Sequence, residues 1–422
     1  MAKLPEIQLP GALRESLAQG HPWVYRTHVP PHVHLAQGAW VRLRCGGWSG
    51  YGLWDAEGPI AVRVFATRAP PDEGLLRERV QAAWELRAPL RAAGCTAYRW
   101  LFGEGDGLPG ITVDRYGAYA VLATYAASVE ALLPAVVAGL RACDPSLRGV
   151  LLRTQTDERQ TNDQRPAASD QPDSADAPPS QGIARRSSFV VRRPSVFWGE
   201  APPHDLTVVE HGLHFYADLW AGQKTGLFLD QRENRHTVEG LSAGRSVLNC
   251  FAYTGAFSLY ALRGGARAVV SADIGKGLAA AAEANIRLNG LDAGRHTFVT
   301  GDCFELLARY AGQGRAFDLV ILDPPSFARS RQSRYAALRA YVKLNALGLR
   351  CVAPGGLLAT ASCTSQVGPE AFKDALAVAG AQAGRRLQII HEAGQPLDHP
   401  VPAGFPEGRY LKFVVGRVLE ER

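Results

Sequence analysis

The hydrophobic pattern of the chain is clearest where two apolar runs flank a turn and a helical stretch. The first run, Ser246–Cys250, leads into the glycine-containing turn Phe251–Gly255. Helix-forming residues follow over Phe257–Arg263, and the second run, Ala268–Ala272, ends at the acid Asp273. This order predicts a βαβ unit of a parallel sheet, in which a glycine turn approaches a ligand and an acid about 20 residues on binds ribose hydroxyls. Nucleotide binding and an α/β unit without a nucleotide both fit this pattern.

Two later apolar runs predict further strands of the same sheet. Phe317–Leu322 ends at Asp323 and the rigid double-proline turn that follows it. Gly355–Ser362 ends at Cys363. If both strands belong to one parallel sheet, Asp323 and Cys363 emerge at the same carboxyl edge, where open α/β sheets bind ligands.

Toward the N-terminus the pattern changes to the alternation that is typical of small β-domains. Gly38–Arg44 and Pro59–Phe65 alternate in this way, whereas Pro71–Ala93 has apolar residues at helical spacing. Further strands are expected at both ends of the glycine-rich run Trp100–Gly117, at Ala118–Thr124 and at Gly149–Arg153, with a helix over Ser128–Arg141. The expected domains are a small β-barrel over residues 1–70, a central α+β domain over 71–205 and an α/β domain over 206–422.

The central domain contains a segment of different composition, from Thr154 to about Ser188. It is rich in Gln, Asp, Pro, Ser, Arg and Ala and has almost nothing to bury. Such a composition cannot offset its ordering entropy, so a disordered insertion is predicted. An RNA-contacting arm and a neutral surface insertion are both compatible with it.

Composition and charge describe an ordinary globular protein of about three domains. The 422 residues are 46% hydrophobic and 20% charged, and the net charge of +6 permits a nucleic-acid partner without demanding one. No stretch approaches the length of a membrane span and the N-terminus lacks a signal pattern, so the cytoplasm is the expected location. The seven cysteines are scattered without a C-x-x-C pair, which argues against a disulfide framework and against a metal site.

The motifs together resemble the RNA cytosine-5 methyltransferases, most of all the RlmI type that acts on large-subunit ribosomal RNA. The turn after Cys250 is similar to the S-adenosylmethionine (SAM) motif of these enzymes, Asp323-Pro-Pro to their Asp-Pro-Pro motif, and Ser362-Cys363 to their Ser-Cys motif. Gly20–Arg26 resembles the opening of the family's RNA-binding PUA domain, and Gly222–Arg235 resembles a run that closes one side of its cofactor pocket. The resemblance covers nearly the whole chain except residues 154–188.

The resemblance implies a SAM-dependent methyltransferase with a Rossmann-like C-terminal domain and ribosomal RNA as its partner. Cys363 is implied as the nucleophile that adds to carbon 6 of cytosine, and Asp323 as the acid that stabilises the adduct. Asp273 is implied to bind the ribose of SAM and Asp302 its adenine. The other implied cofactor contacts are Phe228, Asp230, Arg232, Asn249, Phe251, Tyr253, Thr254, Gly255 and Asp323, and the implied substrate contacts are Pro324, Pro325 and Ser326. From the residues alone, Lys224 and Arg232 fit either anion binding or an exposed helix start.

Three other functions remain open. Asp-Pro-Pro also serves enzymes that methylate exocyclic amines, although there an aromatic follows directly, where this chain has Ser326. A related family methylates guanine and needs no nucleophile, so Cys363 counts against it. The third is a non-catalytic RNA-binding factor of ribosome assembly. Thr364 stands where the family commonly has serine, and Ser365-Gln366 lacks its usual histidine, so the base that removes the carbon-5 proton is unassigned. Monomer and homodimer are not distinguished.

Overall fold

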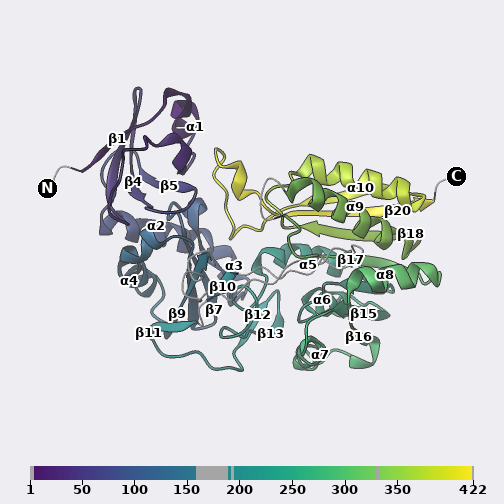
Figure 1. Cartoon of the computed structure of the whole chain (residues 1–422). Coiled ribbons are helices and arrows are strands. Elements are labelled where there is room, and N and C mark those ends of the chain that lie inside the picture. Colours follow the sequence, from purple (N-terminus) through teal and green to yellow (C-terminus); the bar gives the residue numbers. More distant parts are fainter. Residues whose placement is uncertain (1–3, 158–188, 192–193, 329–332, 421–422) are drawn as a thin grey trace, which may run out of the picture.

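The computed structural model describes residues 4–157, 189–191, 194–328 and 333–420. In these residues the strands form three larger sheets and one two-stranded hairpin, arranged along the chain as Figure 1 shows. From residue 158 to residue 188, the predicted insertion lies outside the described residues. Its first residues, Thr154–Asp157, continue strand β9 (Gly149–Asp157), which runs four residues beyond the predicted end at Arg153. The strand extends because Thr154 pairs with Thr124 on one side and Asp157 with Phe189 on the other.

The first sheet has five strands in the order β1-β3-β4-β5-β2. Its strands are β1 (Glu6–Gln8), β2 (Trp23–Tyr25), β3 (Trp40–Cys45), β4 (Trp48–Trp54) and β5 (Ile60–Ala66). The expected alternation is present in β3, where Val41, Leu43 and Cys45 are buried and the residues between them are partly exposed. Helix α1 (Arg14–Ala18) contributes Leu17 to the same small core.

The second sheet runs β10-β9-β8-β7-β6, with β11 also paired to β9. Its remaining strands are β6 (Ala97–Phe102), β7 (Ile111–Tyr116), β8 (Tyr119–Thr124), β10 (Phe189–Val191) and β11 (Ser195–Gly199). Helices α2 (Glu73–Leu86) and α4 (Leu133–Cys143) pack on one face, next to the short helix α3 (Ala88–Ala92). The opposite face packs against the C-terminal part of the chain, so every residue of β8 is buried. The predicted helix over Ser128–Arg141 begins instead as a 3-10 helix, Ala127–Leu132.

A short hairpin joins the central and C-terminal parts. Its strands, β12 (Thr207–Glu210) and β13 (Leu213–Tyr216), are antiparallel. The buried carboxylate of Glu210 accepts three hydrogen bonds from Arg235 in helix α5 (Arg232–Gly240) and one from Tyr260. Because these charges are paired and buried, they fix the hairpin against the C-terminal domain.

The third sheet has seven strands in the order β16-β15-β14-β17-β18-β20-β19. They are β14 (Ser246–Cys250), β15 (Ala268–Asp273), β16 (His296–Thr300), β17 (Phe317–Leu322), β18 (Val352–Ser362), β19 (Arg385–Ala393) and β20 (Lys412–Glu420). The first five run parallel, and β20 is antiparallel to both of its neighbours. The predicted βαβ unit, with helix α6 (Ala256–Arg263) as its crossover, is therefore present.

Helices cover both faces of this sheet (Figure 1). Helix α6 and helix α7 (Leu278–Leu288) pack on one face with Val247, and helices α8 (Cys303–Gly312) and α9 (Arg334–Arg350) on the other with Leu248. Helix α10 (Pro369–Ala383) packs beside α9. Burial on both faces is the mark of a doubly wound α/β fold, whose ligand crevice lies at the carboxyl ends of the strands.

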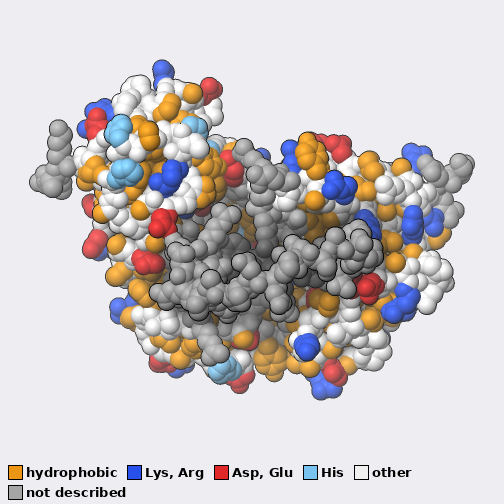
Figure 2. Space-filling view, in the orientation of Figure 1, with side chains coloured by type: hydrophobic (Ala, Val, Ile, Leu, Met, Phe, Trp, Pro, Cys, Tyr) orange, Lys and Arg blue, Asp and Glu red, His pale blue; other side chains and the backbone are white. Residues whose placement is uncertain are grey.

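The predicted domain boundaries near residues 70 and 205 stay predictions, although the three sheets fall within residues 6–66, 97–199 and 246–420. None of the described helices combines the length and apolar character that a membrane crossing needs. Acidic and basic side chains are interspersed over the described parts of the face in Figure 2, so the net positive charge is not concentrated there.

Candidate active site

The carboxyl edge of the third sheet brings most of the predicted site residues together. Cys250 is in register with Ala272 on one side and Leu322 on the other, and Leu322 is in register with Thr360. The segments that leave these strands therefore start at one level of the sheet. One direct contact follows from this: the thiol of Cys363 lies 3.9 Å from the carbonyl oxygen of Pro324.

Asp323 is held in a setting that favours its neutral form. Burial is the main reason why the pKa of its carboxyl group is raised to about 7, and the nearby carboxylate of Asp230 raises it further. The positive charge of Lys224 opposes both effects. The amide of Gln231 donates a hydrogen bond to Asp323 Oδ1 at 2.8 Å and fixes its orientation. Both protonation states of Asp323 are accessible near neutral pH, which suits a group that takes up and returns a proton.

Cys363 lies among charges of both signs. Burial is the main reason why the pKa of its thiol is raised to about 11, and the carboxyl groups of Asp323 and Asp230 also raise it. The positive charges of Lys224 and Lys412 lower this pKa by less than burial raises it. The ammonium of Lys412 donates to the carbonyl of Thr364 at 2.6 Å, directly beside Cys363. Burial lowers the pKa of Lys412 itself to about 8. At neutral pH Cys363 is therefore a thiol, and a cysteine becomes nucleophilic only when it has lost this proton.

Asp230 is ionised and lies next to this pair. Burial alone would raise the pKa of its carboxyl, but Lys224 and then His399 hold it well below its ordinary range. Lys224 Nζ and the Tyr410 hydroxyl each donate to Asp230 Oδ2 at 2.7 Å. Its other oxygen, Oδ1, is buried and has no hydrogen-bond partner within the described residues. A carboxylate oxygen without a donor is a position where a ligand can supply one.

The turn after β14 has a strained backbone. Phe251 and Tyr253 have positive φ angles of 62° and 48°, and Gly255 at the start of α6 has a φ of 82°. Two contacts hold the turn: the amide of Phe251 donates to the sulfur of Cys303 at 3.3 Å, and that of Tyr253 to Asp273 Oδ2 at 3.0 Å. Such conformations cost on the order of 1–3 kcal/mol each in non-glycine residues and gather at ligand sites.

The two predicted acids after β15 and β16 differ in their partners. Asp273 also accepts from the amide of Gly275 at 3.0 Å, so its carboxylate organises the turn on both sides. Asp302 uses Oδ1 to cap helix α8, accepting from Phe304 and Glu305. Asp302 therefore has a structural role as a helix cap, and its contact with adenine stays a prediction.

Two predicted cofactor contacts lie in the interior. Asn249 is buried in β14 and donates to Ser258 at 2.9 Å, while its Oδ1 is left without a partner within the described residues. Arg232 is fully buried and pairs with Asp398 at 2.9 and 3.0 Å and with Glu233 at 2.8 Å. These contacts join Asn249 and Arg232 to neighbouring buried side chains of the protein. Direct contact of either residue with a cofactor stays a prediction.

The Asp-Pro-Pro turn is tied to the strand that carries Cys363. The hydroxyl of Ser326 donates to the carbonyl of Ala328 at 2.9 Å and lies 3.0 Å from that of Thr364, which is 2.7 Å from the hydroxyl of Tyr341 in α9. Thr364, a departure from the family's usual serine, thus links the Asp-Pro-Pro turn to helix α9. Pro324 is buried and Pro325 is exposed.

Sequence reasoning missed several residues at this edge, namely Gln231, Ile274, Tyr410 and Lys412. Ile274 follows Asp273 directly and is 68% exposed, which is unusual for a large apolar side chain. An apolar residue just after the acid was the available signal for it. Lys412 gave no such signal because its role depends on the pairing of β20 with β18, where it stands opposite Ser362.

Comparison with known protein families finds a match for the N-terminal domain and another for most of the rest of the chain. Residues 143–400 match the S-adenosylmethionine-dependent methyltransferase family, and residues 7–67 match the PUA-like domain. The ribosomal RNA large subunit methyltransferase I of Erwinia tasmaniensis is 34% identical over 411 residues, which cover 96% of this chain and 97% of the relative. The protein of the same name from Serratia proteamaculans is 35% identical over 421 residues, again covering 96% and 97%.

Among solved structures, that of SMU.776, a methyltransferase complexed with SAH, has a TM-score of 0.81 and 22% sequence identity and covers 98% of this chain and 100% of that chain. This likeness, with the PUA-like match, confirms the predicted fold class: an α/β SAM methyltransferase with an N-terminal PUA-like domain. The relatives are similar over nearly their full length, and the methyltransferase match covers more than half of the chain. The protein therefore belongs to the ribosomal RNA large subunit methyltransferase I family of SAM-dependent methyltransferases.

Proposed function

We propose that the protein methylates carbon 5 of a cytosine in large-subunit ribosomal RNA, with Cys363 as a covalent nucleophile. The observation that carries this proposal is the contact of Cys363 with the Asp-Pro-Pro turn, beside a carboxyl group whose pKa is about 7. The names of the relatives support ribosomal RNA as the substrate. A thiol next to a proton-transferring acid is what addition to a pyrimidine ring requires.

The residues at the carboxyl edge fit SAM. Buried polar atoms of three predicted contacts have no partner within the described structure: Asp230 Oδ1, Asn249 Oδ1 and Thr254 Oγ1. We propose that Asp273 binds the ribose hydroxyls and that Ile274 covers the adenine next to Asp302. The unpartnered oxygen of Asp230 then accepts from the amino group of the cofactor. When bound, SAM supplies an electrophilic methyl group.

Replacing Asp273 by alanine is expected to weaken SAM binding at least tenfold. A hydrogen bond to a charged group contributes roughly 1.5–3 kcal/mol, and the carboxylate also holds the amides of Tyr253 and Gly275. Calorimetric titration with SAM alone measures the change. Asp374→Ala, which removes an exposed acid from α10, is the matched control. SAM affinity equal to that of the control would contradict this placement of the ribose.

The protons balance within the proposed site. Carbon 5 of cytosine becomes nucleophilic when the sulfur of Cys363 bonds to carbon 6 and ring nitrogen 3 gains a proton. Asp323 is the group that can carry the proton from the thiol to that nitrogen, because its pKa of about 7 lets it both accept and donate. Transfer of the proton from the thiol to Asp323 is uphill, because the thiol pKa is about 11 and that of Asp323 about 7. Ring nitrogen 3 of the bound base then takes up this proton.

After methyl transfer, two further steps restore the enzyme. A base removes the proton from carbon 5, and the electron pair forms the 5,6 double bond as sulfur leaves carbon 6 as a thiolate. Asp323 then carries the proton from ring nitrogen 3 back to that thiolate. Lys224 and Lys412 both favour the departing thiolate, since each lowers the pKa of Cys363. The linked hydroxyls of exposed Ser326 and buried Thr364 and Tyr341 keep the strand end and the Asp-Pro-Pro turn at a fixed separation during both steps.

Mass analysis of nuclease-digested ribosomal RNA tests the proposed function. RNA from cells that lack the gene is expected to lose one 5-methylcytidine from the large subunit, and a plasmid copy of the gene should restore it. Loss of a methylated guanosine or of an amine-methylated base would support the corresponding enzyme instead. An unchanged set of modified nucleosides would support a non-catalytic role in ribosome assembly.

A further inference from the structure

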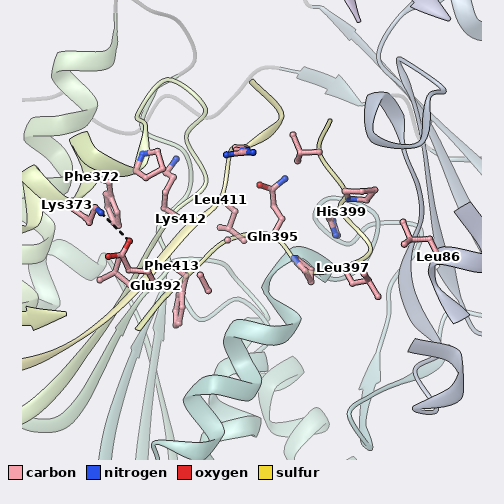
Figure 3. Close-up of a pocket in the computed structure, with 18 residues that line it drawn as sticks. Leu86, Phe372, Lys373, Glu392, Gln395, Leu397, His399, Leu411, Lys412 and Phe413 are labelled. Atoms are coloured by element: carbon pink, nitrogen blue, oxygen red, sulfur yellow. Dashed lines mark ion pairs between the residues drawn. The ribbon is translucent and has the colours of Figure 1, made fainter. Parts of the chain in front are cut away.

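A groove of about 670 Å³ lies beside the candidate active site. It runs between helix α10, the ends of β19 and β20, and Leu86 of helix α2 (Figure 3). In Figure 3, Phe372 and Lys373 lie at one end, while Leu397 and His399 lie toward Leu86 at the other. Its volume is in the range of small-ligand sites, and none of the proposed SAM contacts lines it.

Lys412 connects this groove to Cys363. Its side chain lines the groove, and its ammonium donates to the carbonyls of Thr364 and Tyr410 at 2.6 and 2.8 Å. The backbone of Lys412 is paired with Ser362, the residue before Cys363. The groove therefore begins at the residue that is paired with the strand end before Cys363.

The side chains that line the groove suit nucleotides, whose flat bases are joined by negatively charged phosphates. Leu86 and Leu397 are apolar yet 39% and 46% exposed, so each offers an uncovered surface. Arg409 brings an exposed positive charge and Lys412 a buried one, whereas Lys373 is already paired with Glu370 at 3.1 Å and with Glu392 at 3.4 Å. Apolar faces for bases with cations for phosphates are the combination that binds single-stranded nucleic acid.

We propose that the groove binds the nucleotides of single-stranded RNA that adjoin the target base, with a base against Leu397 and Leu86 and a phosphate on Arg409. This inference rests on the proposed function, because it takes RNA as the substrate. A base presented to Cys363 has to leave its stack, so its neighbours need a surface of their own. The groove supplies that surface at the edge of the sheet where the target base enters.

The test compares Arg409→Glu with Arg386→Glu. Both change an exposed arginine of the same domain by two charge units, but Arg386 lies on β19 outside the groove. With large-subunit ribosomal RNA purified from cells that lack the gene, Arg409→Glu is expected to weaken binding at least tenfold and to raise the KM for RNA. The dependence of log affinity on log salt should flatten by about 0.7 for a lost single-strand phosphate contact. Arg386→Glu should match the wild type, and both variants should keep its SAM affinity and melting temperature.

A second pair tests the apolar wall. Leu397→Ala should weaken RNA binding, whereas Ile390→Ala, which truncates a side chain of similar exposure on β19 outside the groove, should not. If the wild type methylates this RNA and Arg409→Glu behaves like Arg386→Glu, the groove proposal fails while the proposed function stands. If Arg409→Glu binds naked RNA normally but fails on ribosomal particles, the occupant is a protein and the proposal is overturned. If the wild type neither binds nor methylates the RNA, both fall.

Discussion

Replacement of Cys363 by alanine is expected to abolish methyl transfer while SAM binding and folding stay close to those of the wild type. Carbon 5 of cytosine does not attack a methyl group unless a nucleophile has added to carbon 6. Loss of a catalytic nucleophile costs on the order of 10⁶ in rate in a well-studied hydrolase, and at least about 10⁴ is expected here. Transfer of a labelled methyl group to ribosomal RNA from cells that lack the gene measures the loss.

The covalent bond itself can be trapped with RNA that carries 5-fluorocytosine. Fluorine at carbon 5 cannot leave as a proton, so the wild type should accumulate an adduct at Cys363 that mass spectrometry detects. Cys143→Ala, which removes another partly exposed cysteine, should form the adduct normally. Substantial methyl transfer by the Cys363 variant, or a methylated guanine as the wild-type product, would remove the cytosine-5 mechanism.

Replacement of Asp398 by asparagine is expected to lower the free energy of unfolding by about 3–5 kcal/mol, the usual cost of breaking a buried ion pair. Asp398 is fully buried and accepts from both terminal nitrogens of Arg232 and from the amide of Arg99 at 2.8 Å. Without that negative charge, the buried guanidinium of Arg232 loses its bidentate partner and keeps the single ion pair with Glu233 that the described residues show. Urea denaturation of the protein without SAM measures the loss.

Exposed Asp374→Asn is the control and should change stability by less than about 0.5 kcal/mol. A change that small at Asp398 would show that the ion pair contributes nothing net. Joint replacement of Arg232 and Asp398 by methionine and leucine should recover part of the loss, because apolar pairs can substitute for buried ion pairs.

Acid should affect the wild type and the Asp398 variant differently. Burial raises the pKa of Asp398, but His399 and Arg232 lower it by more, so the folded-state pKa lies below the unfolded value of about 3.9. Stability from such a group is present above the unfolded pKa and is lost as pH falls below it. The asparagine variant has no such loss, so the gap in stability between the two proteins should narrow below about pH 4.

Much of the fold could be predicted because its signals are local. The apolar runs that end at Cys250, Asp273, Asp323 and Cys363 each form a strand close to the predicted bounds, and the resemblance predicted the family that the comparisons confirm. The 3-10 start of the helix near Ser128 was missed, since tertiary packing decides how a helix begins.

The contacts that hold the site residues in place could not be predicted, because they join parts of the chain that are distant in sequence. Arg232 and Asp398 are 166 positions apart, and the pairing of Lys412 with Thr364 exists only once β20 lies beside β18. From the sequence alone, a charged residue at the start of a helix can be interpreted equally well as a ligand contact or as a solvent-exposed side chain. Only the folded chain shows that Arg232 is paired in the interior.

The insertion of β20 between β18 and β19 has a consequence for how the protein is made. While the ribosome is still adding residues 394–411, β18 has an open edge and β19 lacks its partner strand in the sheet, although Cys363 has already been synthesised. Lys412 is the first residue of β20, so the cation beside Cys363 arrives together with the strand that closes the sheet. A nascent chain interrupted before this point carries Cys363 next to an unfinished, aggregation-prone edge, and synthesis of β20 is what completes both the sheet and the surroundings of the cysteine.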